Sequence, residues 1–572
     1  MSASFTLSDR LKIVRLFVFD GATTAFRHIS FNPLMFWRLS GPTAEELLIA
    51  PQDIQTTDPT LANEFYSGYF SFAGKTANCS GVSPFEIIPP SEAWYRELVE
   101  FGWLRHLRAS RTEISRVQAR VHVDDWIRLD SKPTSRAWNV ESAATRVMSW
   151  LCHSPLLLEG CEHPFYRRFM KSLTRQERYL RLMYKDAPPG LPRLKAAIAL
   201  SYASVCIAGY DNQVKSAGKR LSRELENQIL PDGGHISRNP EAIIRILALL
   251  LPLRQAILTR NFVPEQALID AIDRMMPMLR FFRMGDGNFA HFNGMGDTPA
   301  DLIATMLAYD DTAASPVLNA PHSGYQRFQI NDTTMVMDTG ALPPEGVSSD
   351  AHAGCLSFEL SCGRDRIVVN CGRPGHRVVG NDGTVWLQLA RSTAIHSTLS
   401  INDQSSCRFL ESERLDRTRG VPVLSGPKNV KADRKSEEGA VTVTASHDGY
   451  VPSFGLKHVR TVSLTSDGNV FSGHDSLLTA KDKQVAPGNK NNFQLRFHLH
   501  PAVSAFASSS RTIELSLPSG KRWLFSSLNA DVGIEDSIAL ADVFGSKNCK
   551  QIVIEGQVGE LPQIDWVFQR LS

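Results

Sequence analysis

The chain of 572 residues carries 62 lysines and arginines against 59 aspartates and glutamates, a formal net charge of +3. With 42% hydrophobic and 21% charged residues, its composition is that of a globular protein with a large core, which excludes disordered, collagen-like and coiled-coil chains. The near balance of charge argues against a dedicated nucleic-acid-binding protein, because such proteins carry a clear basic excess. At roughly 150 residues per domain, the length predicts about two to four domains.

The cysteines and the N-terminus indicate the compartment. The nine cysteines form no CxxC pair, which favours reduced thiols over a disulfide framework or a cysteine-based metal site. Charges interrupt every apolar stretch near the N-terminus, and the run Leu16 to Phe19 is too short for the core of a signal peptide. No stretch approaches the roughly 20 apolar residues of a membrane span. The sequence therefore predicts a soluble, cytoplasmic protein.

The first 315 residues show the periodicity of helices. One predicted helix carries apolar residues at three- and four-residue steps, namely Val214, Ala217, Leu221, Leu225 and Ile229. Pro240 and Pro264 each open a long apolar segment, and proline in a first helical turn costs no hydrogen bond. This half is therefore predicted to be all-α.

After about Pro316 the hydrophobic period changes to two. Phe493, Leu495, Phe497 and Leu499 alternate with polar residues, as half-buried strands do. Pro518-Ser519-Gly520 separates two such runs and predicts a hairpin. Many short strands bounded by turn residues indicate an antiparallel sandwich.

Four segments, in this order, resemble those of the heparinase II/III-like polysaccharide lyases: PDGGHISRNP (231–240), AHAGCLSFEL (351–360), VVNCG (368–372) and RSTAIHSTL (391–399). The resemblance implies an incomplete (α/α) toroid, residues 1–315, packed against a β-sandwich, residues 316–572, with a substrate cleft between them. It also implies cleavage of an acidic, uronic-acid-containing polysaccharide or oligosaccharide by β-elimination.

Elimination needs a group that neutralises the uronate carboxylate, a base for the C5 proton and an acid for the leaving oxygen. The family often places an Asn-His pair and a Tyr-His pair around the DGGH loop. This sequence has Leu191-Pro192 and Ala242-Ile243 there. The remaining candidates for catalytic roles are His235 as base or carboxylate partner, Arg238 as anion clamp, His352, and Tyr450 as a substitute acid.

The resemblance also implies a metal site in the second half. His352 and His396 match positions where relatives place metal-binding histidines, and Asn370 falls where an aspartate ligand is expected. Neutral asparagine is a poorer zinc ligand than a carboxylate, so a zinc site here would be weakened. The alternative is that these polar residues satisfy one another within the domain. No organic cofactor is expected.

A glycine-rich segment between two predicted helices, residues 283–297, is a candidate sugar-binding loop. Asn288, His291 and Asn293 within it, with Asn239 after the DGGH loop, are the expected substrate-binding residues. Phe289 and Phe292 are candidate stacking faces. The alternative is a loop tucked against the second domain, with its aromatic residues in the inter-domain core.

Three functions remain open at this point. The leading hypothesis is a polysaccharide lyase acting on an acidic glycan. The second is a lyase-fold protein that has lost its chemistry and binds glycans, for which the substitutions around the DGGH loop argue. The third is a glycan hydrolase that uses carboxylates such as Asp232, Asp286 and Asp350. A row of arginines, including Arg105, Arg116 and Arg120, is either a polyanion groove or a solvated face.

Overall fold

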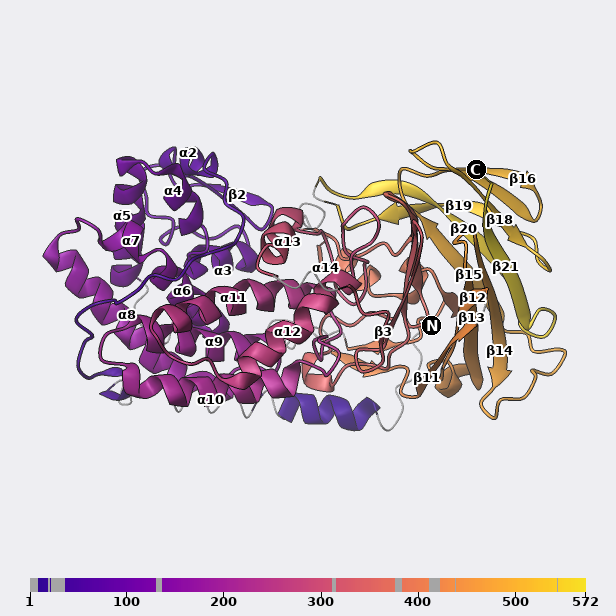
Figure 1. Ribbon diagram of the computed structural model, residues 1–572, viewed down its shortest axis with the longest axis horizontal. Helices are drawn as coiled ribbons and strands as arrows, with labels where there is room; N and C mark the ends of the chain where they lie inside the picture. The colour runs from indigo at the N-terminus through magenta and orange to yellow at the C-terminus, as the bar shows by residue number, and fades with distance from the viewer. Residues whose placement is uncertain are drawn as a thin grey trace.

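The protein has a helical N-terminal part and a C-terminal part of antiparallel sheets (Figure 1). The structure, a computed structural model, describes residues 9–18, 21, 37–129, 136–310, 315–375, 383–410, 422–437, 439–542 and 544–571. The fold class predicted from the change of period is confirmed. The toroidal curvature of the helical part stays a prediction. The predicted boundary at residue 315 falls between the helix α13 (Ala300–Leu307) and the strand β3 (Asn319–Ala320).

Helix α9 lies at the centre of the helical part and packs against α6, α10 and α11, and α11 also packs against α12. A small hairpin, β1 (Tyr69–Phe72) and β2 (Lys75–Asn78), lies beside α2 and α3. Besides α13, the described helices of this part have the following bounds: α2 (Leu61–Tyr66), α3 (Glu92–Glu100), α4 (Leu104–Ser110), α5 (Glu113–Leu129), α6 (Val140–Cys152), α7 (Ser154–Leu158), α8 (His163–Met183), α9 (Leu191–Cys206), α10 (Asp211–Gln228), α11 (Pro240–Thr259) and α12 (Gln266–Phe281).

The hydrophobic patterns explain how these helices are placed. Helix α10 buries Ala217, Leu221 and Leu225 on one face, as its periodicity predicts. Helix α11 is apolar on nearly all sides and lies inside the bundle. Among the described residues, α11 alone passes a test of length and composition for a membrane span, and 67% of the tested window is buried within the protein. That burial is typical of a core helix.

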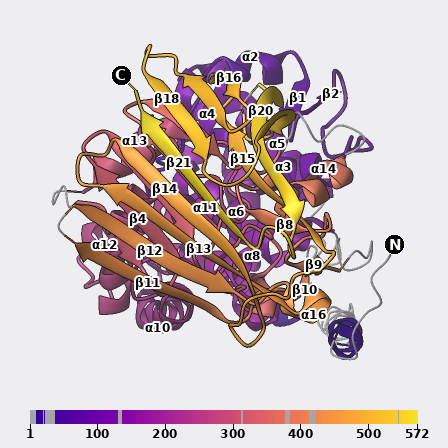
Figure 2. The same cartoon turned by 90° about the vertical axis from the view of Figure 1, so that its right-hand side faces the viewer.

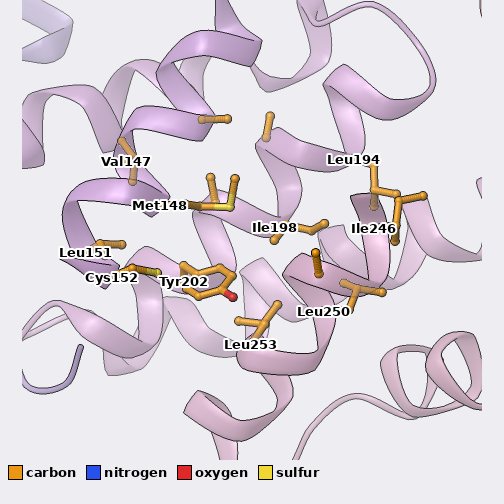
Figure 3. Close-up of a cluster of buried hydrophobic side chains, with 14 of the residues drawn as sticks. Val147, Met148, Leu151, Cys152, Leu194, Ile198, Tyr202, Ile246, Leu250 and Leu253 are labelled. Atoms are coloured by element: carbon orange, nitrogen blue, oxygen red, sulfur yellow. The ribbon is translucent and has the colours of Figure 1, made fainter. Parts of the chain in front are cut away.

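The core of the helical part forms where α6, α9 and α11 meet. Figure 3 shows α6 contributing Val147, Met148, Leu151 and Cys152, with side chains from the other two helices directed at them. These partners are Leu194, Ile198, Tyr202, Ile246, Leu250 and Leu253. The same continuous core includes Tyr325 and Val336 of the β part, so the two parts share buried apolar surface.

The C-terminal part consists of two large sheets. One runs in the order β11-β12-β13-β14-β21-β18-β17-β16 and faces the viewer in Figure 2, and the other runs β19-β20-β15-β7-β6-β5-β4-β3 with β8 beside β15. A second hydrophobic core is formed by side chains of both sheets, including Phe358, Phe497 and Trp566. The predicted hairpin at Pro518-Ser519-Gly520 joins β17 to β18.

The strands of this part have the following bounds: β4 (Tyr325–Ile330), β5 (Thr333–Asp338), β6 (Phe358–Cys362), β7 (Asp365–Val369), β8 (Leu399–Ile401), β9 (Arg408–Phe409), β10 (Val423–Ser425), β11 (Val430–Glu437), β12 (Ala440–His447), β13 (Leu456–Thr465), β14 (Val470–Thr479), β15 (Asn492–Leu499), β16 (Ser504–Ser509), β17 (Thr512–Ser516), β18 (Arg522–Ser527), β19 (Gly533–Ala539), β20 (Lys547–Gln557) and β21 (Gln563–Arg570). Two short helices, α14 (Gly383–Leu389) and α16 (Val451–Phe454), interrupt them.

The helical residues 9–18 contact the β part. Leu16 packs with Leu410 and Leu424, and Lys12 Nζ donates to the carbonyl of Leu424 at 2.6 Å. Arg408 pairs with Asp9 at 3.6 Å. The first described helix therefore belongs spatially with the last third of the chain.

Candidate functional site

The DGGH loop, residues 231–239, connects α10 to α11 and lies directly against the β part. Glycine is required at two positions in it. A Cβ on Gly233 would lie 2.0 Å from the carbonyl oxygen of Arg274 in α12, and one on Gly234 would lie 1.9 Å from Ser323 Oγ in the β part. Asp232 accepts hydrogen bonds from Ser323 N at 2.7 Å and from Ser323 Oγ at 2.6 Å. The motif thus forms a close contact between the helical part and the β part. We call the region where these two parts meet around the DGGH loop the interdomain seam.

Arg238 anchors this seam from within. Its five N–H groups are all used: Nε donates to Ser323 O, Nη1 to Gly340 O and Ala341 O, and Nη2 to Gly324 O and the Asp338 carboxylate. The guanidinium also lies 4.9 Å from the centre of the Tyr325 ring. Burial opposes the charge, but Asp338 raises the pKa of Arg238 above its ordinary value. The predicted role as an anion clamp is not supported, because no N–H remains for a substrate.

His235 is a buried residue of the seam, 2% exposed. Its Nδ1 lies 2.7 Å from Ser237 Oγ and its Nε2 lies 3.1 Å from Gln228 Oε1. Burial lowers the pKa of His235 to about 4, so the ring is neutral at pH 7. A neutral imidazole could act as a base, but both nitrogens already have partners and neither reaches solvent. These contacts favour a structural role over the predicted catalytic one.

The structure brings His352 and His396 together at the seam. His352 Nδ1 lies 3.2 Å from His396 Nε2, and His396 Nδ1 lies 2.7 Å from the carbonyl oxygen of Ser392. Burial lowers the pKa of His396 to about 4 and holds the pKa of His352 well below its ordinary value, with the neighbouring His396 adding to the shift of His352. Asn370 contacts the residue that follows His396, because its Oδ1 accepts a hydrogen bond from the backbone N–H of Ser397 at 3.0 Å.

The predicted substrate-binding asparagines hold the seam together. Asn239 caps α11 through Oδ1 and donates from Nδ2 to Asp350 at 3.1 Å. Asn293 donates to Tyr325 Oη at 2.6 Å and to Asp338 at 3.1 Å, and its Oδ1 accepts from the backbone N–H of His352. Both residues are buried, and their side-chain hydrogen-bonding groups are used within the protein.

The glycine-rich loop, residues 283–297, is tucked against the β part. Its Phe289 and Phe292 are fully buried, so the prediction that they are stacking faces for a sugar is wrong. Asn288 bonds to Asp286 in its own turn through both its backbone and side-chain N–H groups. His291 donates its backbone N–H to Glu359 and places Nδ1 3.3 Å from Asn370 O, and burial lowers its pKa to about 3. The alternative interpretation, a loop packed at the inter-domain core, is the one that the structure favours.

Tyr450 lies in the β core. It is 1% exposed, and its hydroxyl donates to the carbonyl of Leu399 at 2.8 Å. Burial raises the pKa of Tyr450 above its ordinary value. The predicted role as general acid is contradicted, because the hydroxyl has no access to the seam and is already used.

Three arginines of the row that was interpreted as either a polyanion groove or a solvated face have protein partners. Arg105 pairs with Asp53 at 3.2 Å, Arg116 with Glu159 at 3.2 Å, and Arg120 donates to Leu157 O at 2.8 Å. Two of the three carboxylates considered for hydrolysis are likewise used, Asp232 by Ser323 and Asp286 by Asn288.

Some polar side chains at the seam stay accessible. Asp350 and Arg373 have side chains that are 41% and 37% exposed, and they approach to 4.0 Å. Arg245, on the first turns of α11, is 48% exposed and pairs with Glu241. Burial opposes its charge, but Glu241 and Asp350 raise the pKa of Arg245. The sequence analysis missed Arg373 and Arg245, although the position of Arg245 in the first turns of the helix after the DGGH loop could have identified it.

A helical part, a two-sheet part and a polar seam between them define a protein of the polysaccharide-lyase fold. Heparinase III has this fold, with a TM-score of 0.72 and 14% identity over 95% of this chain and 89% of that one. Heparan sulfate lyase HepC from Pedobacter heparinus matches with a TM-score of 0.59 and 16% identity over 97% of this chain and 87% of that one.

The sequence comparisons give the family. The family described as "Heparinase II/III-like, C-terminal" matches residues 312–567. FtsZ-localized protein C from Caulobacter vibrioides (strain NA1000 / CB15N) is 31% identical over 529 residues, which are 91% of this chain and 89% of that protein. The chain belongs to the heparinase II/III-like family, and its likeness to FtsZ-localized protein C covers both the helical and the β part.

Proposed function

We propose that this protein acts in cell division together with FtsZ, in the cytoplasm, and that its lyase fold binds an acidic glycan without cleaving it. The likeness to a protein named for its localisation with FtsZ, over nearly the full length of both chains, carries the first half of this proposal. Function is not inherited with the fold, so the second half must rest on the seam itself.

Three features of the seam support binding without cleavage. Buried apolar residues, Ala242 and Ile243, stand where related lyases often have a Tyr-His pair. His235 and Arg238 use their hydrogen-bonding groups within the protein. The accessible cations Arg245 and Arg373 stay available to a carboxylate or sulfate group.

Co-sedimentation with FtsZ tests the first half. The purified full-length protein is mixed with FtsZ and GTP, and the polymers are pelleted. We expect the protein in the pellet, and in the supernatant when GDP replaces GTP and no polymer forms. A fluorescent fusion should also form a band at midcell that coincides with FtsZ. A protein that stays in the supernatant in both nucleotides and spreads evenly through the cell would contradict the proposal.

Elimination is a second candidate function, favoured by one observation. Among the hydrogen bonds of the described residues, none uses His352 Nε2, and His352 lies at the seam near the exposed Asp350 and Arg373. In such a reaction the base takes the C5 proton of the uronate, the electron pair forms the C4–C5 double bond, and the C4–O bond breaks. The leaving oxygen then takes a proton from an acid or water, while an arginine balances the carboxylate.

The two candidates differ in turnover. Heparan sulfate and alginate are incubated with the protein, and the ultraviolet absorbance of unsaturated ends is followed. Binding without cleavage predicts heat of binding in calorimetry and no rise in absorbance, with binding weakened by Arg373→Gln. A rise in absorbance that His352→Gln abolishes would establish elimination and refute the proposed lack of cleavage.

A further inference from the structure

The spacing of His352 and His396 raises the question of a shared metal ion. Zinc binds imidazole nitrogen at about 2.0–2.1 Å, so two imidazoles on one tetrahedral zinc have nitrogens roughly 3.3 Å apart. The observed separation of 3.2 Å between His352 Nδ1 and His396 Nε2 fits that arrangement and equally fits a direct hydrogen bond. Whether further metal ligands lie around the pair distinguishes a zinc site from a direct hydrogen bond.

Asn370 supplies the deciding observation. The acceptor atom of its side chain, Oδ1, receives the backbone N–H of Ser397, which fixes the orientation of the amide. The free edge is therefore Nδ2, which is buried and has no hydrogen-bond partner among the described residues. An amide N–H group presents a proton rather than a lone pair, so it cannot ligate a cation. Within the described residues, no group of three His, Cys, Asp or Glu side chains is arranged to hold a metal ion.

The segments that carry the two histidines are also joined without a metal. Ala353 N donates to Arg391 O at 2.8 Å, and Thr393 Oγ1 donates to Ala353 O at 2.8 Å. Arg391 Nε donates to Ala351 O at 2.8 Å. These three bonds link the backbone on either side of His352 to the turn that precedes His396, so a bridging ion is not needed to fix the geometry.

We infer that this position is a zinc-type site that lacks one ligand and functions as a metal-free histidine pair. His396 Nδ1–H donates to Ser392 O, which leaves the lone pair on His396 Nε2 to accept from His352 Nδ1–H. This tautomer leaves a lone pair on His352 Nε2. The residues present do not fit the zinc that the family resemblance implies, and Asn370 is the residue that makes the difference. The inference stands independently of the proposed role with FtsZ.

The test restores the missing ligand. Wild type, Asn370→Asp and the double variant Asn370→Asp/His396→Ala are each saturated with zinc, dialysed into metal-free buffer and analysed for bound metal. We expect less than 0.1 zinc per chain, on the order of a background level, in wild type and in the double variant, and about one per chain in Asn370→Asp. Circular dichroism verifies that each protein is folded. Thermal unfolding gives a second measurement: Asn370→Asp should melt lower than wild type in EDTA and recover in zinc, since a ligand that binds the native state stabilises it.

Two results would overturn the inference. One is a stoichiometric zinc in wild type that His352→Ala removes, because the pair would then bind metal without a carboxylate. The other is a folded Asn370→Asp protein that neither retains zinc nor gains thermal stability from it, because the missing carboxylate would then not explain why wild type does not bind zinc. Nitrogen-15 NMR of the histidine rings in wild type should give the pattern of neutral imidazoles, unchanged by added zinc.

Discussion

Arg238→Met is the perturbation that most directly tests the role of the DGGH loop. Methionine keeps much of the length of the side chain but removes the charge and all five N–H donors. The Asp338 carboxylate, 2% exposed, would lose its cationic partner and keep the hydrogen bonds from Asn293 Nδ2 and Gly340 N. The carbonyl groups of Ser323, Gly324, Gly340 and Ala341 would each lose the hydrogen bond from Arg238, and the Gly324 carbonyl would keep the one from Thr339 N.

The expected cost follows from the buried ion pair. Removing one partner of such a pair destabilises a protein by about 3–5 kcal/mol, because the other charge is left buried and uncompensated. At about 2–4 °C per kcal/mol for domains of 150–250 residues, the melting temperature should fall by roughly 6–20 °C. The matched control is Arg245→Met on the same helix, where the exposed pair with Glu241 predicts a loss of about 1 kcal/mol or less.

Thermal and urea unfolding, followed by circular dichroism, measure both variants. The double variant Arg238→Met/Asp338→Asn should recover part of the loss, because the orphaned charge is removed with its partner. Equal small losses for Arg238→Met and Arg245→Met would refute the reasoning and reopen Arg238 as a residue available to a ligand.

Further predictions concern the histidines and glycines. His122→Leu should stabilise the protein by about 1 kcal/mol in urea unfolding, because both ring nitrogens of His122 are buried without a partner among the described residues; a loss of stability would contradict this. His235 and His396 have folded-state pKa values of about 4, below the 6.5 of an unfolded histidine, so the unfolded chain binds more protons between these values. The free energy of unfolding should therefore fall as pH drops from 6.5 to 4, and a melting temperature constant across that range would refute the assignment. Gly234→Ala, whose Cβ would clash with Ser323, should lower the melting temperature by several degrees, roughly the effect of 1–3 kcal/mol of overpacking. Gly102→Ala, whose Cβ would have 3.5 Å to its nearest neighbour, should change it far less.

The fold could be predicted because its signals are local. The apolar steps of α10 and the alternation of Phe493, Leu495 and Phe497 in β15 are read within a single element. Each pattern reports which face of its own element is buried. The change of period after residue 316 was therefore enough to give a helical part followed by antiparallel sheets.

The candidate site was harder, because the partners that decide each role are distant in sequence. The loop position of Arg238 was consistent with an exposed anion clamp, and only the approach of Ser323 and Asp338, about 85 and 100 residues later, shows it to be buried. Tyr450 likewise depends on Leu399, 51 residues earlier. His352 and His396 could be placed together by resemblance, but the orientation of the Asn370 amide depends on Ser397 and has no signal in the sequence.

The contact of residues 9–18 with Leu410 and Leu424 has a consequence for biosynthesis. During synthesis this helix must wait for a binding surface that is made about 400 residues later, at rates of roughly 5–20 residues per second. The nascent chain would thus expose Leu16 and its neighbours for on the order of 20–80 seconds. This helix can therefore reach its native partners only after Leu410 and Leu424 have been made.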